Sequence, residues 1–125
     1  MKIYELQIGN WVYDGNSIAQ VTGITCDGII ETTHNQSSNI EIIRPIPLSA
    51  EILEKNGLEK DNHDRLYGEY FDEDENRELE ITVDDKTGEI WWSYNWDEYR
   101  IIRLRYVHEL QNALKLCGIE KEIVL

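Results

Sequence analysis

Half of the chain's aromatic residues fall within sixteen consecutive positions, and three arginines lie among them. Aromatic rings offer flat faces for stacking, and a guanidinium group attracts carboxylates, phosphates and the faces of indoles. This combination is typical of surfaces that recognise proteins or nucleotides. We call it the aromatic–arginine block, and it consists of Trp91, Trp92, Tyr94, Trp96, Tyr99, Arg100, Arg103, Arg105 and Tyr106.

The alternation of side chains along strands limits which members of the block can act together. Trp91 and Trp92 are adjacent in a predicted strand, so they point to opposite faces and cannot share one core. The pattern leaves open which of the two is exposed. Arg103 and Arg105 share a face of the next strand, and Leu104 points the other way. We expect the binding residues to be Trp92, Tyr94, Trp96, Arg100, Arg103 and Arg105.

The same arginines also allow a purely structural interpretation. Arg103 and Arg105 can pair with acidic side chains on neighbouring strands, and such surface ion pairs usually contribute little to stability. The candidate acidic partners are Glu78, Glu80 and Glu89. The sequence leaves both interpretations open.

The spacing of polar residues does not match a catalytic or metal-binding motif. Asp72 to Asn76 begins like a calcium-binding loop, but Arg77 stands where the turn needs glycine and Val83 where the bidentate glutamate belongs. His108 is followed one turn later by two amide side chains in place of an acid or a nucleophile, so we expect it to form hydrogen bonds. The sequence therefore predicts a non-enzymatic protein without a cofactor or a metal.

The charge of the chain limits its partners. With 25 acidic residues and 12 lysines and arginines, the formal net charge is -13. The segment from Glu59 to Glu89 alone holds thirteen acidic and four basic residues. Affinity for nucleic acid rests largely on the neutralisation of phosphates by Lys and Arg, so we expect no general DNA binding.

Cysteine usage and hydropathy indicate the compartment. Cys26 and Cys117 are far apart and show neither a metal-binding spacing nor a disulfide framework, so we expect two reduced thiols. The N-terminus has no apolar signal region, and no apolar run approaches the length of a membrane span. We expect a cytoplasmic protein that has no membrane partner.

The first third of the chain predicts a small antiparallel sheet. Asp14-Gly15 and Asp27-Gly28 supply the positive φ angles of tight turns between short strands. The predicted strands are 11–13, 18–25, 29–33 and 40–43. Strands of this length close most economically into an SH3-like barrel or a curled sheet. Trp11 and Tyr13 lie on one side of the first strand, and we expect that side to be the core.

A short helix with recognisable ends follows two prolines. Ser49 is a predicted N-cap, and Leu48 and Leu53 are spaced for a hydrophobic staple. Gly57 supplies the left-handed residue that ends a helix over 50–56.

The rest of the chain predicts a second sheet and a C-terminal helix. The predicted strands are 66–71, 78–83, 89–94 and 99–104, with a turn at 84–88. Apolar residues at helical spacing predict a helix over 107–117, and the tail 119–125 is a candidate edge strand. The predicted fold is α+β, with a barrel-like subdomain at 1–47 and an α+β subdomain at 48–125 within one compact unit.

Three segments resemble a family of small uncharacterised proteins from phages and prophages of gut anaerobes. The family has an IGN-x-V start, a PIPL-[ST]-x-E-x-L-x-x-x-G middle and a V-H-x-L-Q-N helix near the end. The matching segments here are Ile8 to Val12, Arg44 to Leu58 and Tyr106 to Asn112. The resemblance implies a phage or prophage context, and it implies no activity, cofactor or site residue.

Three functional hypotheses follow. The first is a non-catalytic interaction module that binds a macromolecular partner, most simply a protein, through a Trp/Tyr/Arg surface. The second is a small-ligand or nucleotide-sequestering protein, in which an indole stacks on the base and an arginine binds the phosphate. The third is an acidic mimic of nucleic acid, in which the run Asp72 to Glu75 helps to occupy a basic partner.

Overall fold

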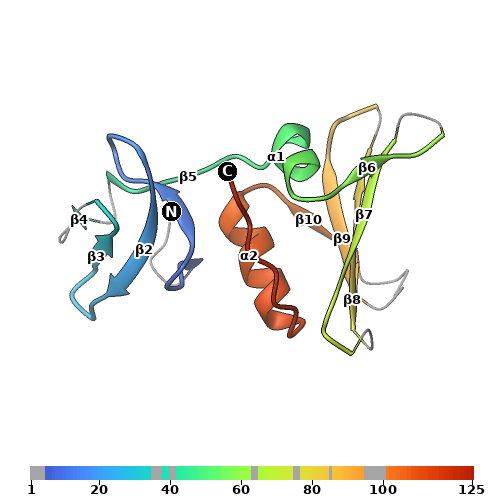
Figure 1. The fold of residues 1–125 in the computed structure, drawn as a ribbon. Coiled ribbons are helices and arrows are strands. Elements are labelled where there is room, and N and C mark those ends of the chain that lie inside the picture. The colour runs from blue at the N-terminus through green and yellow to red at the C-terminus, as the bar shows by residue number, and fades with distance from the viewer. Residues whose placement is uncertain are drawn as a thin grey trace. The chain divides into compact units, whose positions relative to one another are not determined.

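A computed structural model describes residues 5–34, 38–39, 42–62, 65–74, 77–84, 86–94 and 101–125. The chain forms two compact units, each built on an antiparallel sheet (Figure 1). The first unit comprises Met1–Pro47 and Tyr106–Asn112, and the second comprises Leu48–Arg105 and Ala113–Leu125. The two sheets and two helices confirm the predicted α+β class.

The first unit contains an open sheet. Its strands are β1 (Trp11–Tyr13), β2 (Ile18–Ile24), β3 (Ile29–Thr32), β4 (Ser38–Asn39) and β5 (Arg44–Pro45), in the order β4-β3-β2-β1-β5. Among the described residues β4 and β5 are the two edges and do not pair with each other, so no closed barrel is found there and the antiparallel sheet of the other alternative holds. The predicted strand at 40–43 is not found as such. Residues 40 and 41 lie outside the described residues, and Ile43 precedes β5.

The core of the first unit lies on the other side of β1 from the one we expected. Val12 is fully buried, whereas Tyr13 is 41% exposed and lies opposite Ile18 and Arg44 in the register. The prediction that Trp11 and Tyr13 form the core is therefore wrong. The physical reason is that aliphatic side chains from several segments fill this small core together with Val12, namely Leu6, Val21, Ile30 and Ile43.

A buried asparagine ties the start of the chain to helix α2 (Val107–Leu116). Asn10 is fully buried, and its Nδ2 donates a hydrogen bond to Oδ1 of Asn112 at 2.9 Å. Its Oδ1 accepts a hydrogen bond from the backbone N–H of Gln7 at 2.8 Å. The Nδ2 of Asn112 in turn donates to the backbone carbonyl of Glu5 at 2.9 Å. Because both the donor and the acceptor of the buried Asn10 amide have partners, these bonds favour one arrangement of residues 5–10 against the start of α2.

Gln111 continues this contact one residue earlier on the helix. Its Oε1 accepts a hydrogen bond from the backbone N–H of Trp11 at 2.8 Å, and its Nε2 donates to the carbonyl of Gly9 at 3.1 Å. The first and last segments of the resemblance therefore meet within the first unit. Their polar residues Asn10, Gln111 and Asn112 form hydrogen bonds that join the start of the chain to α2.

His108 lies on the same part of α2 and is almost completely buried. Its ring stacks on Tyr106 with 5.7 Å between centroids, and its Nε2 is 3.7 Å from Oε2 of Glu5. Its Nδ1 has no hydrogen-bond partner among the described residues. Burial lowers the pKa of His108 below its usual value, and the opposing attraction of Glu109 and Glu5 is smaller. The imidazole is therefore neutral at pH 7.

The second unit is a five-stranded antiparallel meander. Its strands are β6 (Glu59–Lys60), β7 (Leu66–Phe71), β8 (Glu78–Val83), β9 (Ile90–Tyr94) and β10 (Ile101–Leu104), in the order β10-β9-β8-β7-β6. The predicted strands 66–71 and 78–83 are confirmed, and the predicted strand 89–94 begins one residue later, at Ile90. Residues 99 and 100 of the last predicted strand lie outside the described residues, and its remainder forms β10. Gly88 has the positive φ expected of the predicted turn. The predicted edge strand at 119–125 is wrong, because this tail is not a strand and buries Ile119 and Ile123.

Helix α1 (Ala50–Lys55) forms as predicted. The side chain of Ser49 accepts a hydrogen bond from the backbone N–H of Ile52 at 3.3 Å, and Gly57 has a φ of 103°. Leu48 and Leu53 are both buried. A helix this short depends on such packing, since isolated helices of a few residues are unstable in water.

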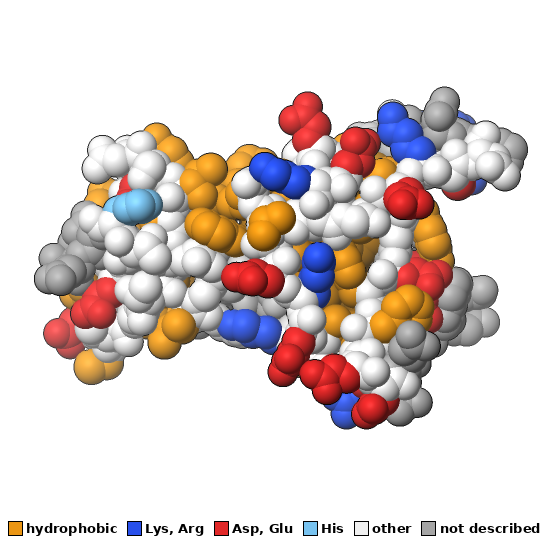
Figure 2. All heavy atoms as spheres, in the orientation of Figure 1, with side chains coloured by type: hydrophobic (Ala, Val, Ile, Leu, Met, Phe, Trp, Pro, Cys, Tyr) orange, Lys and Arg blue, Asp and Glu red, His pale blue; other side chains and the backbone are white. Residues whose placement is uncertain are grey.

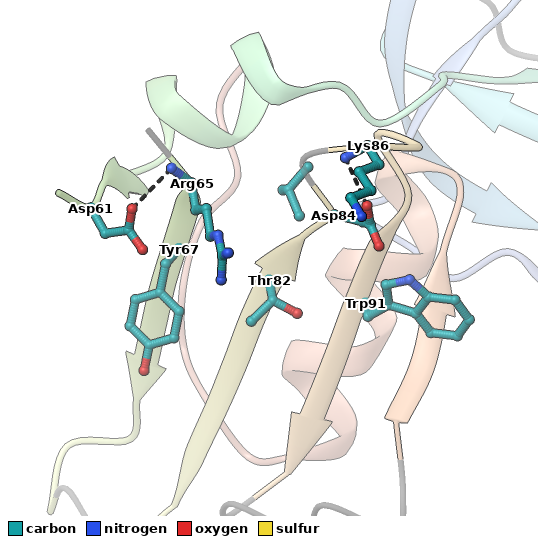
Figure 3. A pocket seen from close by; sticks show the side chains of 8 residues that line it. Asp61, Arg65, Tyr67, Thr82, Asp84, Lys86 and Trp91 are labelled. Carbon is teal, nitrogen blue, oxygen red and sulfur yellow. Dashed lines mark hydrogen bonds between the residues drawn. The ribbon is translucent and has the colours of Figure 1, made fainter. Parts of the chain in front are cut away.

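One face of the second sheet is covered, and the other, which we call the open face, carries exposed side chains such as Phe71 and Arg103. The C-terminal part of α2 and the tail, which belong to the same unit as the sheet, lie on the covered face (Figure 3). The buried side chains of that face are Leu66, Tyr70, Leu79, Ile81, Ile90, Trp92 and Leu104, and the helix and tail contribute Ala113, Leu114, Cys117, Ile119 and Ile123. No helix in the described part of the chain combines the length and the apolar character needed to cross a membrane.

Asn56 fastens the C-terminal tail to the second unit. Its buried side chain donates to the backbone carbonyls of Ile52 and Val124 at 2.8 and 2.7 Å, and it accepts a hydrogen bond from the N–H of Val124 at 2.8 Å. The hydroxyl of Tyr70 donates to the Asn56 carbonyl at 2.8 Å, and burial raises the pKa of Tyr70 to about 12. The tail therefore has a specific hydrogen-bonded anchor.

Replacement of Asn56 should release this anchor. Asn56→Ala removes three hydrogen bonds and leaves backbone groups of Val124 without partners, so we expect a loss of about 3 kcal/mol in the free energy of unfolding. Denaturant titration followed by tryptophan fluorescence measures the change in the second unit. The matched control is Asn62→Ala, since Asn62 is exposed. Equal stability of the two variants would show that the anchor contributes nothing.

Acid should destabilise the first unit through His108. Its folded-state pKa lies below the usual 6.5, so the unfolded chain takes up a proton that the folded chain resists. The free energy of unfolding should fall as the pH drops through about 6.5, until the folded-state pKa is passed. Denaturation across this range should show a smaller pH dependence for His108→Gln than for the wild type.

A pH dependence of His108→Gln that equals that of the wild type would contradict the assignment to His108.

Candidate functional site

The open face of the second sheet carries a row of side chains from four strands. Tyr67 pairs with Thr82, Thr82 with Trp91, and Trp91 with Arg103. We call these four residues the cross-strand row. Residues directly opposite each other in a sheet share a face, so all four project away from the core. The next row on the same face contains Glu69, Glu80 and Ser93.

The neighbouring tryptophans divide between the two faces of β9. Trp92 is 9% exposed and pairs with the buried Ile81, whereas Trp91 is half-buried on the open face. The expectation that Trp92 contributes to a binding surface is therefore corrected. Trp91 takes that position, because Trp92 shares the core-facing side of β9 with the buried Ile90 and lies opposite the buried Ile81, and the residue next to it in the strand points the other way.

The remaining predicted site residues that the structure describes lie on both sides of the second sheet. Tyr94 is 37% exposed and lies two positions beyond Trp92, on the core-facing side of the same strand. Leu104 is buried while Arg103 and Arg105 are exposed, which confirms the predicted alternation on β10. Trp96 and Arg100 lie outside the described residues.

Arg103 takes part in the predicted surface ion pair. Its Nη1 is 3.6 Å from Oε1 of Glu89, one of the three acidic residues named as its possible partners. Both side chains are partly exposed, so the pair adds little to stability. Arg103 therefore belongs to the cross-strand row and is restrained by Glu89.

A hollow of about 540 Å³ lies at one end of the open face, beside the turn that joins β8 to β9 (Figure 3). We call it the Trp91 hollow. It combines two aromatic rings with two cations and two carboxylates. Its lining consists of Asp61, Arg65, Tyr67, Thr82, Val83, Asp84, Lys86 and Trp91.

The two carboxylates of the hollow accept hydrogen bonds from the backbone beside its two cationic residues. Oδ1 of Asp84 accepts hydrogen bonds from the backbone N–H groups of Lys86 and Thr87 at 2.8 and 3.1 Å. These bonds hold the pKa of Asp84 below its usual value. Oδ1 of Asp61 accepts a hydrogen bond from the N–H of Arg65 at 3.0 Å. The backbone N–H groups of Lys86 and Arg65 are thus each bound to a carboxylate of the hollow.

The sequence does not reveal the hollow, because its residues come from three separate stretches of the chain, 61–67, 82–86 and Trp91. Tyr67 and Thr82 are fifteen positions apart in the chain and meet only through the register of β7 and β8. The one local signal was the turn at 84–88, which fixes where Lys86 emerges. The other lining residues come together through strand pairing, which the alternation pattern does not specify.

Beyond the cross-strand row the open face is acidic. Glu69 and Glu80 lie directly opposite each other, and burial followed by the charge of Glu69 raises the pKa of Glu80. The Tyr67 hydroxyl donates a hydrogen bond to Glu69. Burial, that hydrogen bond and the nearby carboxylates raise the pKa of Tyr67. Figure 2 shows acidic side chains scattered over the visible surface of both units, with a few lysine or arginine side chains among them.

The described side chains of the open face offer stacking, ion pairing and hydrogen bonding. No group of three or more His, Cys, Asp or Glu within the described ranges is arranged to hold a metal ion.

Comparison with protein-family models, with curated proteins and with solved structures found no match. The resemblance to phage-associated proteins stays a prediction.

The opposed carboxylates predict a stabilising substitution. Because the folded-state pKa of Glu80 lies above its usual 4.5, its carboxylate is disfavoured in the folded protein at pH 7. Glu80→Gln should raise the free energy of unfolding by about 0.5 kcal/mol at pH 7. The gain should shrink in acid, where protonation of Glu80 in the wild type gives the same relief. Denaturation curves at both pH values measure it.

The exposed Glu120 in the tail supplies the control. Glu120→Gln should change stability at neither pH. A loss of stability in Glu80→Gln at pH 7 would contradict repulsion between the two carboxylates.

Proposed function

We propose that this chain is a non-catalytic interaction module that binds a protein partner with a basic surface. The observation that carries the proposal is the cross-strand row, which presents Tyr67, Trp91 and Arg103 in register on the face opposite the core. Trp, Tyr and Arg are the residues most enriched in the hot spots of protein interfaces.

The aromatic side chains of this face are accessible and well positioned. Trp91 and Tyr67 are half-buried, and Phe71, four positions further along β7, is 44% exposed. Rings held by paired strands lose little conformational freedom on binding. A surface that keeps such rings exposed beside polar groups is typical of recognition sites.

The charge of the face indicates the chemistry of the partner. Glu69 and Glu80 repel each other, and a lysine or arginine of a partner placed between them would relieve this repulsion. The same cation would lie near Tyr67, where the ring adds a cation–π attraction. The net charge of -13 extends the attraction over the whole chain and speeds association with a basic partner.

The resemblance to phage and prophage proteins supplies the setting of this proposal. We place the module in the cytoplasm, where its partner would be a basic host or phage protein. In this proposal the acidic residues attract the basic partner to the binding face, and mimicry of nucleic acid would be one form of that attraction.

Affinity capture tests the proposed face. Tagged wild-type protein should retain a basic partner, and Trp91→Ala or Phe71→Ala should reduce the retained amount at least about tenfold, as expected for hot-spot truncations. Retention should also fall as the salt concentration rises from about 50 to about 300 mM, because screening weakens the attraction. Circular dichroism confirms that each variant is folded.

The control is Tyr13→Ala, which removes a similarly exposed aromatic ring from the first unit. It should retain the partner as the wild type does. Equal capture by the wild type, Trp91→Ala and Phe71→Ala would refute the proposed face.

A further inference from the structure

The geometry of the Trp91 hollow points to a second binding capacity, for a small ligand that joins a planar ring to an anionic group, and we propose a nucleoside monophosphate as its simplest form. This inference goes beyond the protein partner and does not depend on it. The volume of about 540 Å³ lies in the range typical of small-molecule sites.

The floor of the hollow provides room for a ring. Tyr67 and Trp91 lie on strands two apart, with Thr82 between them (Figure 3). Strands are spaced by about 4.8 Å, so the backbones that carry the two rings are roughly 10 Å apart. The short side chain of Thr82 leaves the space above it open. A planar group in the hollow can stack on the ring of Tyr67 or on the larger indole of Trp91, the two aromatic side chains of the lining.

The loops at the rim provide donors for an anion. Arg65 and Lys86 enter the hollow from its two sides, and Figure 3 shows the guanidinium of Arg65 lying toward Thr82. An oxygen-rich anion can accept hydrogen bonds from a guanidinium, an ammonium and the Thr82 hydroxyl together. The carboxylates of Asp61 and Asp84 each direct one oxygen to the backbone of their own loop.

Both parts of the ligand are required. The net charge of -13 repels anions from a distance, so the cations of the hollow act only locally and phosphate alone should bind weakly. A ring that carries no anionic group cannot form the anion contacts with Arg65 and Lys86. The predicted ligand therefore gains affinity from stacking on Trp91 and from the anion contacts at once.

Titration calorimetry on the full chain tests the site with four probes: adenosine 5′-monophosphate, adenosine, inorganic phosphate and indole-3-acetate. The monophosphate should bind, and adenosine and phosphate should each bind at least about tenfold more weakly. Equal binding of indole-3-acetate would show that an aromatic carboxylate also serves, and weaker binding would identify the nucleotide as the preferred form. Equal affinity for adenosine and its monophosphate, or no binding of any probe, would overturn the proposal.

Variants locate the binding. Trp91→Ala and Lys86→Ala should each weaken monophosphate binding at least about tenfold. The controls Tyr13→Ala and Lys55→Ala, which remove an exposed ring and an exposed cation elsewhere, should leave it unchanged. Wild-type affinity in both hollow variants would place the ligand elsewhere and overturn the assignment.

The variants Phe71→Ala and Lys86→Ala separate this site from the proposed partner surface. Phe71 belongs to the open face but does not line the hollow, whereas Lys86 lines the hollow beside the turn. Phe71→Ala should weaken partner capture and spare ligand binding, and Lys86→Ala should do the reverse. Failure of either function can thus be recognised independently of the other.

Discussion

The burial of Trp92 is the constraint on which the recognition surface depends. Adjacent residues of a strand face opposite sides of a sheet, so placing Trp92 in the core under α2 forces Trp91 outward. The register of the meander then sets Trp91 beside Thr82 on one side and Arg103 on the other. The burial of Trp92 therefore places Trp91 both in the cross-strand row and in the lining of the Trp91 hollow.

The segments that resemble phage proteins have structural roles in this chain. Asn10 and Asn112 fasten the start of the chain to α2, and Ser49 caps α1. Asn56, at the end of that helix, anchors the C-terminal tail. The residues of the open face lie outside these segments, in the strands between them.

Local signals predicted much of the fold and little of the site. The strands 66–71 and 78–83 and the helix capped by Ser49 follow from alternation and capping chemistry, which act over a few residues. Two predictions failed where packing competes: aliphatic side chains, and not Trp11 and Tyr13, fill the first core, and the tail buries Ile123 instead of forming a strand. The hollow depends on strand pairing, which no local pattern encodes.

The most direct test of this account is the solvent exposure of individual indoles. Fluorine NMR of 5-fluorotryptophan-labelled protein resolves each ring, and Trp→Phe variants assign the signals. A soluble paramagnetic agent should broaden the signal of Trp91 strongly and leave that of Trp92 sharp, because only Trp91 faces the open side of β9. Equal broadening of both signals, or a protected Trp91 beside an exposed Trp92, would contradict the account.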